Sequence, residues 1–328
     1  MTVLMDGEGC ADPAFACGGR QPAVLIRLTE PDGRTGVLLI DVGNDPTVLE
    51  GNLDAWFNRQ GLNAPLAEQG FRTAIYFSHD HTFAPLMGPP SVFRSGPPRC
   101  LALAWKFMGE VPIQNSNLPN ICHEMKRALK NKPSAQKICA TVSRLPRGLT
   151  PVVYSDGVPS RRAWTYSYEM IESDGNPPFR PRESVFLLRS GDGYLVYSTC
   201  AHAAAPQEGG RPSTNLHAAA SIRDLIDAGK LPDGPIHTLV TGSCGMQQRI
   251  EDQNKGTDSS SSDEAQLWRD GLRSLAARIG LRRVYLSHCS LSSFRHIFPI
   301  FQEIFGENVF QAVPGSSIRL EDPAPARP

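Results

Sequence analysis

Four histidines follow apolar segments of the chain, which is where ligand sites of α/β proteins gather. They are His79, His81, His202 and His288, in the segments SHDH, STCAH and LSHCS. Neutral imidazole binds zinc, iron and copper, and a catalytic zinc ion needs about three protein ligands and an open position for water. Alternate positions of an extended chain point to the same side, so the imidazoles of His79 and His81 can converge on one ion. We therefore expect a metal site formed by His79, His81 and His202.

A histidine near a strand end can also be an ordinary hydrogen-bonded part of the structure. We interpret four further histidines in this way, namely His123, His217, His237 and His296. The close pair His79 and His81 is harder to explain by chance than any one of these.

The elements that must position the histidines alternate between strands and helices. Two strands within residues 22–43 are joined by the turn Pro31-Asp32-Gly33, a helix is expected over 49–60, and a strand leads into His79. Further along, a hairpin ends at His202, a helix follows over 216–229, and strands lead to Cys244 and His288. This alternation predicts an α/β fold with its chemistry at strand ends.

Composition limits the classes of partner. The 328 residues include 33 Lys and Arg and 33 Asp and Glu, and this balance favours a small-molecule substrate over nucleic acid or an anionic membrane. The N-terminal residues do not form a secretory leader and no apolar run could span a bilayer, so we expect a cytoplasmic protein. Eight cysteines without C-x-x-C spacing indicate neither a zinc ribbon nor a disulfide framework, so we expect most of them to be reduced, buried thiols. The oligomeric state cannot be read from the sequence.

Residues 83–180 have a poor periodic pattern, and we interpret them as an elaboration of the core fold. Five basic residues between positions 126 and 137 favour a solvated helix face, with a clamp for an anionic substrate as the alternative. The last residues, 321–328, are expected to be a disordered tail.

Several motifs, taken in order, resemble the metallo-β-lactamase superfamily, and in particular its dihydropterin ribofuranosylaminobenzene-phosphate synthase-like branch. They are LLIDVG, FSHDH, VYSTCAH, VTGSCG and SHCS, followed by FGENVF and GSSIRL. The resemblance implies a metallo-β-lactamase-like αββα sandwich over residues 22–320, preceded by a separate segment over 1–21. The range 83–180 would then be an insertion or lid over the metal edge.

Members of this family usually bind two metal ions, and this chain departs from the family pattern at the site of the second ion. In an ungapped alignment Phe83 and Ala84 stand where the family has an Asp-His pair, and neither side chain can bind a metal. The resemblance therefore implies one ion held by His79, His81 and His202, zinc first and iron or manganese as alternatives. In a gapped alignment Asp80 and His81 would supply the Asp-His pair instead.

Four further residues have roles that the resemblance implies. Asp41 would orient a ligand histidine or the loop that carries it. Cys244 and His288, with Asp80, could complete a second, softer metal site, because thiolate and imidazole both suit zinc. Alternatively, Asp80 or His288 would move the proton in catalysis.

The function expected from these residues is a metal-dependent reaction on a small, anionic molecule. Hydrolysis of an ester, lactone or phosphoester is one form, and a related lyase or cyclisation step is another. Two alternatives stay open: a protein of the same fold that has lost catalysis and binds a ligand or partner, and an iron-dependent redox enzyme.

Overall fold

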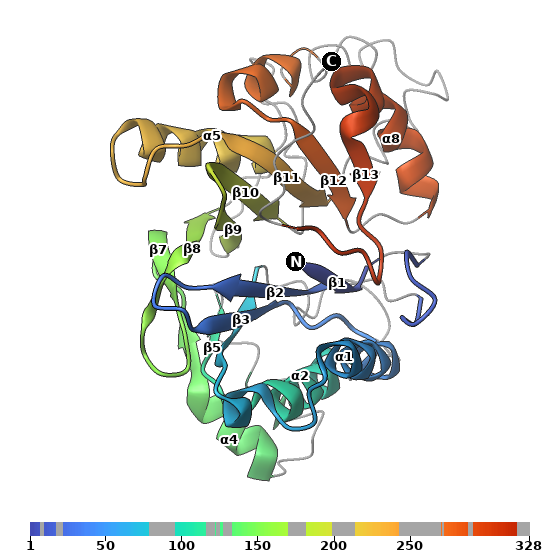
Figure 1. The fold of residues 1–328 in the computed structure, drawn as a ribbon, viewed down its shortest axis with the longest axis vertical. Coiled ribbons are helices and arrows are strands. Elements are labelled where there is room, and N and C mark those ends of the chain that lie inside the picture. The colour runs from blue at the N-terminus through green and yellow to red at the C-terminus, as the bar shows by residue number, and fades with distance from the viewer. Residues whose placement is uncertain are drawn as a thin grey trace, which may run out of the picture. The chain divides into compact units, whose positions relative to one another are not determined.

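A computed structural model gives the fold of the chain (Figure 1). It describes residues 1–6, 10–17, 22–78, 96–115, 122, 125–126, 133–169, 182–198, 214–242, 270, 272–287 and 291–319. The chain divides into two compact units. Unit 1 comprises Met1–Glu169, Pro181–Ser184 and Val313–Ile318, and unit 2 comprises Met170–Arg180, Val185–Ala312 and Arg319–Pro328.

Unit 1 contains a six-stranded sheet with the order β1-β2-β3-β4-β5-β6. The pairs β1–β2 and β2–β3 are antiparallel, whereas β3, β4, β5 and β6 are parallel. The strands span Thr2–Met5, Ala23–Thr29, Thr35–Ile40, Arg72–Phe77, Ile113–Asn115 and Val142–Arg144. The predicted turn Pro31-Asp32-Gly33 joins β2 to β3, so the first hairpin is confirmed.

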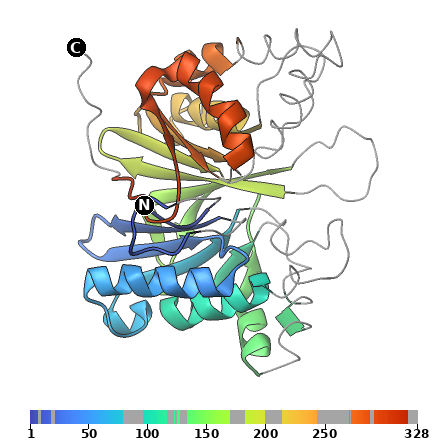
Figure 2. The same cartoon turned by 90° about the vertical axis from the view of Figure 1, so that its right-hand side faces the viewer.

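Helices α1 (Pro46–Gln60), α2 (Gly96–Met108) and α4 (Pro133–Thr141) contribute to the core of unit 1. Their apolar side chains form one buried cluster with alternate residues of the sheet, such as Val37 and Ile75. Figure 2 shows α1 and α2 along one face of this sheet. A short 3-10 helix, η1 (Leu66–Gln69), precedes β4. The helix predicted over 49–60 is therefore confirmed, and it begins three residues earlier, at Pro46.

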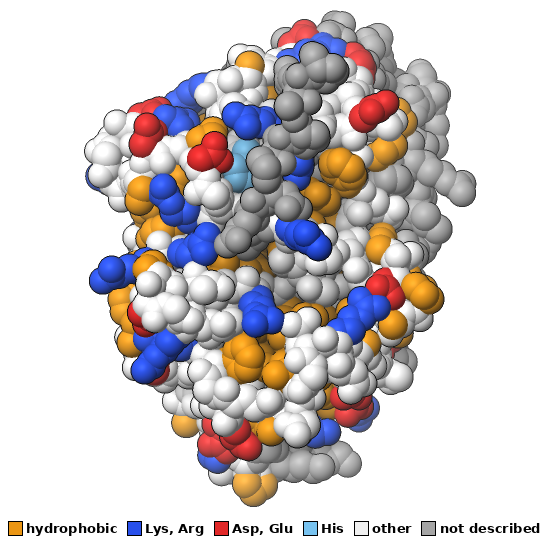
Figure 3. Space-filling model, in the orientation of Figure 1, with side chains coloured by type: hydrophobic (Ala, Val, Ile, Leu, Met, Phe, Trp, Pro, Cys, Tyr) orange, Lys and Arg blue, Asp and Glu red, His pale blue; other side chains and the backbone are white. Residues whose placement is uncertain are grey.

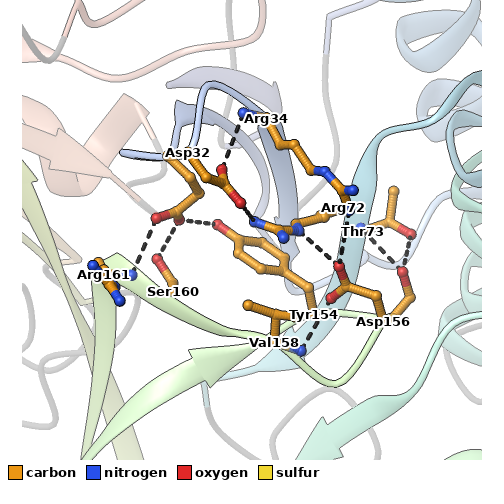
Figure 4. Close-up of polar contacts among 11 residues, drawn as sticks. Asp32, Arg34, Arg72, Thr73, Tyr154, Asp156, Val158, Ser160 and Arg161 are labelled. Atoms are coloured by element: carbon orange, nitrogen blue, oxygen red, sulfur yellow. Dashed lines mark hydrogen bonds and ion pairs between the residues drawn. The ribbon is translucent and has the colours of Figure 1, made fainter.

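Within unit 1, a hairpin of β7 (Gly148–Val153) and β8 (Pro159–Glu169) is joined to the end of β2 by a buried carboxylate (Figure 4). Glu30, only 4% exposed, accepts hydrogen bonds from the Tyr154 hydroxyl at 2.8 Å and the Ser160 hydroxyl at 2.5 Å. The Arg161 N–H donates to the same carboxylate at 3.1 Å. Three donors compensate the loss of water around Glu30, so the carboxylate can be buried there.

An ion-pair cluster lies beside this contact, at the N-terminal end of β4 (Figure 4). The buried Arg72 guanidinium donates to Asp156 at 2.7 Å and pairs with Asp32 at 2.7 Å. Burial raises the pKa of Asp156, but the Val158 N–H and Arg72 outweigh it, so the pKa falls below its ordinary value. This cluster joins the β2–β3 turn, β4 and the β7–β8 connection.

The strands β13, β12, β11, β10 and β9 follow in this order, and all of them except the first three residues of β9 belong to unit 2. The β9–β10 pair is antiparallel, whereas β10, β11, β12 and β13 are parallel. The elements span β9 Arg182–Ser190, β10 Gly193–Ser198, α5 Thr214–Asp227, β11 Ile236–Gly242, β12 Arg283–Ser287, α8 Leu291–Phe305, η3 Gly306–Asn308 and β13 Val309–Gln311. Helix α5 contacts β11, and α8 contacts β12 and β13. The second predicted hairpin and the strands before Cys244 and His288 are therefore confirmed.

Three further features lie in parts of the chain with little periodic pattern. The described parts of 83–180 include β5 and β6, which extend the sheet of unit 1, and α2 and α4, which contribute to its core. Residues 1–21 contribute β1 to the same sheet and hold the Cys10–Cys17 disulfide, an exception to the expectation that most cysteines are reduced. Near the C-terminus, Ser317 makes an isolated bridge to Thr2.

Along the described parts of the chain, no helix is both long enough and apolar enough to cross a membrane.

Replacement of Gly36 tests the close contact between β3 and Tyr154. A Cβ atom on Gly36 would lie 2.3 Å from the Tyr154 hydroxyl oxygen, and the Tyr154 ring is buried. Gly36→Ala should therefore lower the free energy of unfolding by about 1–3 kcal/mol in urea titrations. The control is Gly51→Ala in α1, where a Cβ meets nothing within 4 Å; it should raise stability by about 0.5–1 kcal/mol. Equal stabilities for the two variants would contradict the contact.

Replacement of Asp156 tests the ion-pair cluster through pH. The pKa of Asp156 in the folded protein lies below its value of about 3.9 in the unfolded chain. The ionised carboxylate therefore stabilises the fold at pH values above about 3.9. This contribution is lost as the pH falls through the folded-state pKa. Asp156→Asn should therefore be less stable than wild type at pH 7, and the difference should shrink below about pH 4 in urea titrations.

The exposed carboxylate of Asp54 in α1 provides the control for this titration. Asp54→Asn should change stability by less than about 0.5 kcal/mol at both pH values. A stability difference for Asp156→Asn that persists unchanged at pH 3 would contradict the role assigned to the charge.

Candidate active site at the strand ends

Asp41 directly follows β3 and has an unusual backbone conformation. Its N–H donates to the Tyr76 carbonyl oxygen at 2.8 Å, which extends the pairing between β3 and β4 by one residue. Its φ of 55° lies in the left-handed region, which Asp tolerates better than most residues other than glycine. The residue is 0% exposed. The chain thus leaves β3 in a bend that places a carboxylate inside the protein.

The Asp41 carboxylate binds Ser78, the residue that follows β4. Oδ1 accepts from the Ser78 N–H at 2.9 Å, and Oδ2 accepts from the Ser78 hydroxyl at 2.6 Å. Both donors are buried, so these charge-assisted bonds are not weakened by competing water. The first predicted metal ligand, His79, is the next residue in the chain. Asp41 therefore fixes the backbone from which the His79 segment begins.

A third segment holds Ser78 from its other side. The Ser184 N–H donates to the Ser78 carbonyl oxygen at 2.7 Å. Both backbone polar groups of Ser78 are therefore satisfied by specific partners, Asp41 and Ser184. This arrangement leaves the end of β4 little conformational freedom.

Two buried residues near this edge were not identified from the sequence. Ser78 was overlooked because a serine carries no metal-ligand signal. Asp6 follows β1 and is 1% exposed. The pairing Met5–Ala23, together with a Gly43 N–H that donates to the Pro22 carbonyl at 3.0 Å, places Asp6 at the same sheet edge as Asp41. The shared pattern of an apolar strand followed by Asp, in TVLMD and LLID, is the signal that could have identified it.

Three parallel strands of unit 2 end side by side. Ser198 of β10 is the Cα partner of Thr241 in β11, and Gly242 of β11 is the partner of Ser287 in β12. His288 directly follows Ser287, and Cys244 comes two residues after Gly242. The segments that carry these two predicted residues therefore start from neighbouring points of one sheet edge.

Asp41 is the one predicted site residue whose position the structure describes. The others lie outside the described residues, namely His79, Asp80, His81, His202, Cys244 and His288, together with Phe83 and Ala84. Within the described ranges, no group of three or more His, Cys, Asp or Glu side chains could hold a metal ion. The predicted ligand set stays a prediction, and the geometry that supports it is that of the strand ends.

His237 agrees with its interpretation as a structural histidine. Its Nδ1 lies 2.8 Å from the Thr238 hydroxyl and its Nε2 lies 3.3 Å from the Ser190 carbonyl oxygen. Burial lowers its pKa, which favours the neutral ring. His237 lies at the start of β11, so it belongs to the opposite end of the strand from Cys244.

The described charges do not favour an anion clamp around Lys137. This residue of the basic stretch makes an ion pair with Glu110, and its ammonium group lies 5.8 Å from the Trp105 ring centre. Both members of the ion pair are exposed, which supports the interpretation of a solvated helix face. Figure 3 shows Lys and Arg side chains interspersed with Asp and Glu on the face that it presents.

Comparisons with known proteins give matches only at the level of structure. No family model and no curated protein matches the sequence. Unliganded yeast PDE1 aligns with a TM-score of 0.50 and 12% identity over 96% of this chain and 99% of its own. Tm1679, described as a metal-dependent hydrolase of the beta-lactamase superfamily, gives 0.49 and 12% over 98% of each chain. The metallo-beta-lactamase fold protein YhfI from Bacillus subtilis gives 0.45 and 11% over 96% and 97%.

At these identities the similarity concerns the fold. The predicted α/β fold class with two sheets is confirmed by the elements of both units. The match to yeast PDE1 shows that this chain shares the fold of that protein.

Replacement of Asp41 tests the carboxylate contact. Asp41→Ala removes both acceptors of Ser78 and puts alanine at a positive φ, so the free energy of unfolding should fall by roughly 3 kcal/mol. Asp41→Asn keeps one carbonyl acceptor and tolerates the backbone conformation, so it should lose only about 1–2 kcal/mol. Urea titrations followed by circular dichroism measure both changes.

Asp45 provides a matched control, because its carboxylate also accepts two backbone N–H groups, from Thr47 at 3.0 Å and Val48 at 3.2 Å. It caps the half-exposed start of α1, and Asp45→Ala should cost about 1 kcal/mol. If Asp41→Ala costs no more than this control, the buried contact does not fix the strand end.

Proposed function

We propose that this chain is a metal-dependent enzyme of the metallo-β-lactamase-like type that acts on a small, anionic molecule. The reaction would be hydrolysis of an ester, lactone or phosphoester, or a related lyase or cyclisation step. The observation that carries the proposal is the buried pair of hydrogen bonds from Ser78 to Asp41, directly before His79.

The Asp41 contact favours a functional strand end over a purely structural one. Burying a carboxylate costs free energy, and a neutral residue could end β3 without that cost. The two bonds to Ser78 hold one short segment in a defined place, as residues that support metal ligands do. His79 and His81 occupy alternate positions immediately after that segment, so their imidazoles suit one ion.

The metal would be held by His79, His81 and His202, with zinc proposed first and iron or manganese as alternatives. Three imidazoles are a donor set that suits a catalytic zinc ion. When bound, the ion supplies Lewis-acid polarisation of the substrate and lowers the pKa of a bound water molecule to roughly 7.

The chain's own residues would then move the proton. Asp80 lies between the two ligand histidines in the sequence, and His288 begins the segment after β12. Either side chain would need to come within about 3 Å of the reacting atom to act as a general acid or base. Cys244, which starts from the strand next to that of His288, would contribute to a second site or contact the substrate.

Metal analysis of the purified protein is the decisive test. We expect one ion per chain, and we expect His79→Ala and His202→Ala to lose at least ninety per cent of both the metal and the activity toward aryl phosphodiester, phosphomonoester and lactone substrates. The matched control is His237→Gln, which removes a hydrogen-bonded histidine and should keep the metal.

Two results would overturn the proposal. A wild-type protein without stoichiometric metal would favour the ligand-binding alternative. Retention of metal and activity by both histidine variants, with a normal circular dichroism spectrum, would show that the ligand set is wrong.

A further inference from the structure

Two cysteines away from the strand ends lie close together in unit 1. The Sγ atom of Cys122 is 3.7 Å from the carbonyl oxygen of Cys139, although the two residues are 17 positions apart. Both are free thiols and both are half-buried. The Cys122 thiol therefore lies next to the Cys139 residue, and both cysteines have access to solvent.

Buried neighbours hold each cysteine in place. Cys122 is helical, and Met125, three residues later, is fully buried in the core of unit 1. Cys139 lies in the last turn of α4, next to Ile138, which is buried in the same core. Because both segments are anchored in one cluster, the closeness of the two cysteines is a property of the fold.

Burial lowers the reactivity of the Cys139 thiol. Burial raises the pKa of Cys139 to about 12, and the neighbouring Cys122 adds to this effect. The thiolate is the nucleophile in thiol–disulfide exchange, so Cys139 is slow to attack an oxidant at neutral pH. Cys122 is the better candidate for the first attack.

We propose that Cys122 and Cys139 are a redox-sensitive pair that forms a reversible disulfide and so links the chain at Cys122 to α4. The oxidant would be a low-molecular-weight disulfide such as glutathione disulfide. The Cys122 thiolate attacks one of its sulfur atoms and releases the first thiol. Cys139 Sγ, which the fold holds near Cys122, then attacks Cys122 Sγ in the mixed disulfide, and its proton passes to the glutathione thiolate that leaves. One disulfide thus becomes two thiols and the protein loses two hydrogens.

Three other described cysteines provide internal comparisons. Cys100 lies in α2 at 0% exposure, and burial raises the pKa of its thiol, so it should not react in the folded protein. Cys10 and Cys17 are already joined in a disulfide.

The test is peptide mapping of the full chain after incubation in glutathione buffers from reducing to oxidising. Trypsin cuts after Lys126, Lys137 and Arg144, so Cys122 and Cys139 fall in separate peptides and their disulfide gives a distinct linked mass. We expect the linked peptide to rise from absent to the main form and to disappear with dithiothreitol, while Cys100 stays free. Oxidation should raise Tm by roughly a few degrees, because the link closes a loop in the unfolded chain.

Variants separate the proposed order of steps from nonspecific oxidation. Cys139→Ser should accumulate a glutathione adduct at Cys122, and Cys122→Ser should leave Cys139 unmodified. Both variants should lose the shift in Tm. If the oxidised wild type carries separate adducts and no linked peptide, or if neither cysteine reacts unless the protein is denatured, the proposal is wrong.

Discussion

The end of β3 depends on one buried charge, the carboxylate of Asp41. A carboxylate without contact to water is stable only when donors replace the lost hydration. The N–H and hydroxyl of Ser78 supply those donors at 2.9 and 2.6 Å. The same bonds determine where the chain leaves β4. The donors that stabilise the buried Asp41 carboxylate therefore also fix the point from which the residue after Ser78 begins. The left-handed backbone of Asp41 is the conformational cost of that constraint.

Buried charged residues have different roles at the two ends of the unit 1 sheet. At the N-terminal end of β4, Arg72 is paired with Asp32 and Asp156, and Glu30 is bound by Tyr154 and Ser160. These contacts join segments that are distant in sequence. Each of these charged groups is bound by partners within the cluster. Arg72 and Ser78 are separated by six residues of extended chain, or about 20 Å, so this cluster is not part of the candidate site. It stabilises the sheet whose other end carries Asp41.

The sequence predicts the elements whose pattern is local. The hairpin from β2 to β3 was predictable because apolar runs flank Pro31-Asp32-Gly33, and β9 and β10 were predictable because they flank Gly191-Asp192-Gly193. The strands β5 (Ile113–Asn115) and β6 (Val142–Arg144) were not, because three residues are too few for a periodic signal. Their place is decided by parallel pairing with distant segments, which no local pattern encodes.

The same distinction applies to the candidate site. That Asp41 and the four histidines follow strands is visible in the sequence, because an apolar run ends before each. That Asp41 binds Ser78 is not visible, because the two residues are 37 positions apart and meet only through the pairing of β3 with β4. The Cys10–Cys17 disulfide was missed for a different reason, since a separation of seven residues matches no common metal or redox motif.

A buried serine directly before a histidine occurs at two strand ends. Ser78 ends the region of β4 before His79, and Ser287 ends β12 before His288; each serine is 1% exposed. A small hydroxyl residue can be enclosed where a strand ends and still hydrogen-bond nearby groups, as Ser78 does with Asp41. A histidine that follows such a residue starts from a fixed backbone position. For His79 the physical basis of a functional interpretation is therefore the fixed position of Ser78, and for His288 it is the burial of Ser287 at the end of β12.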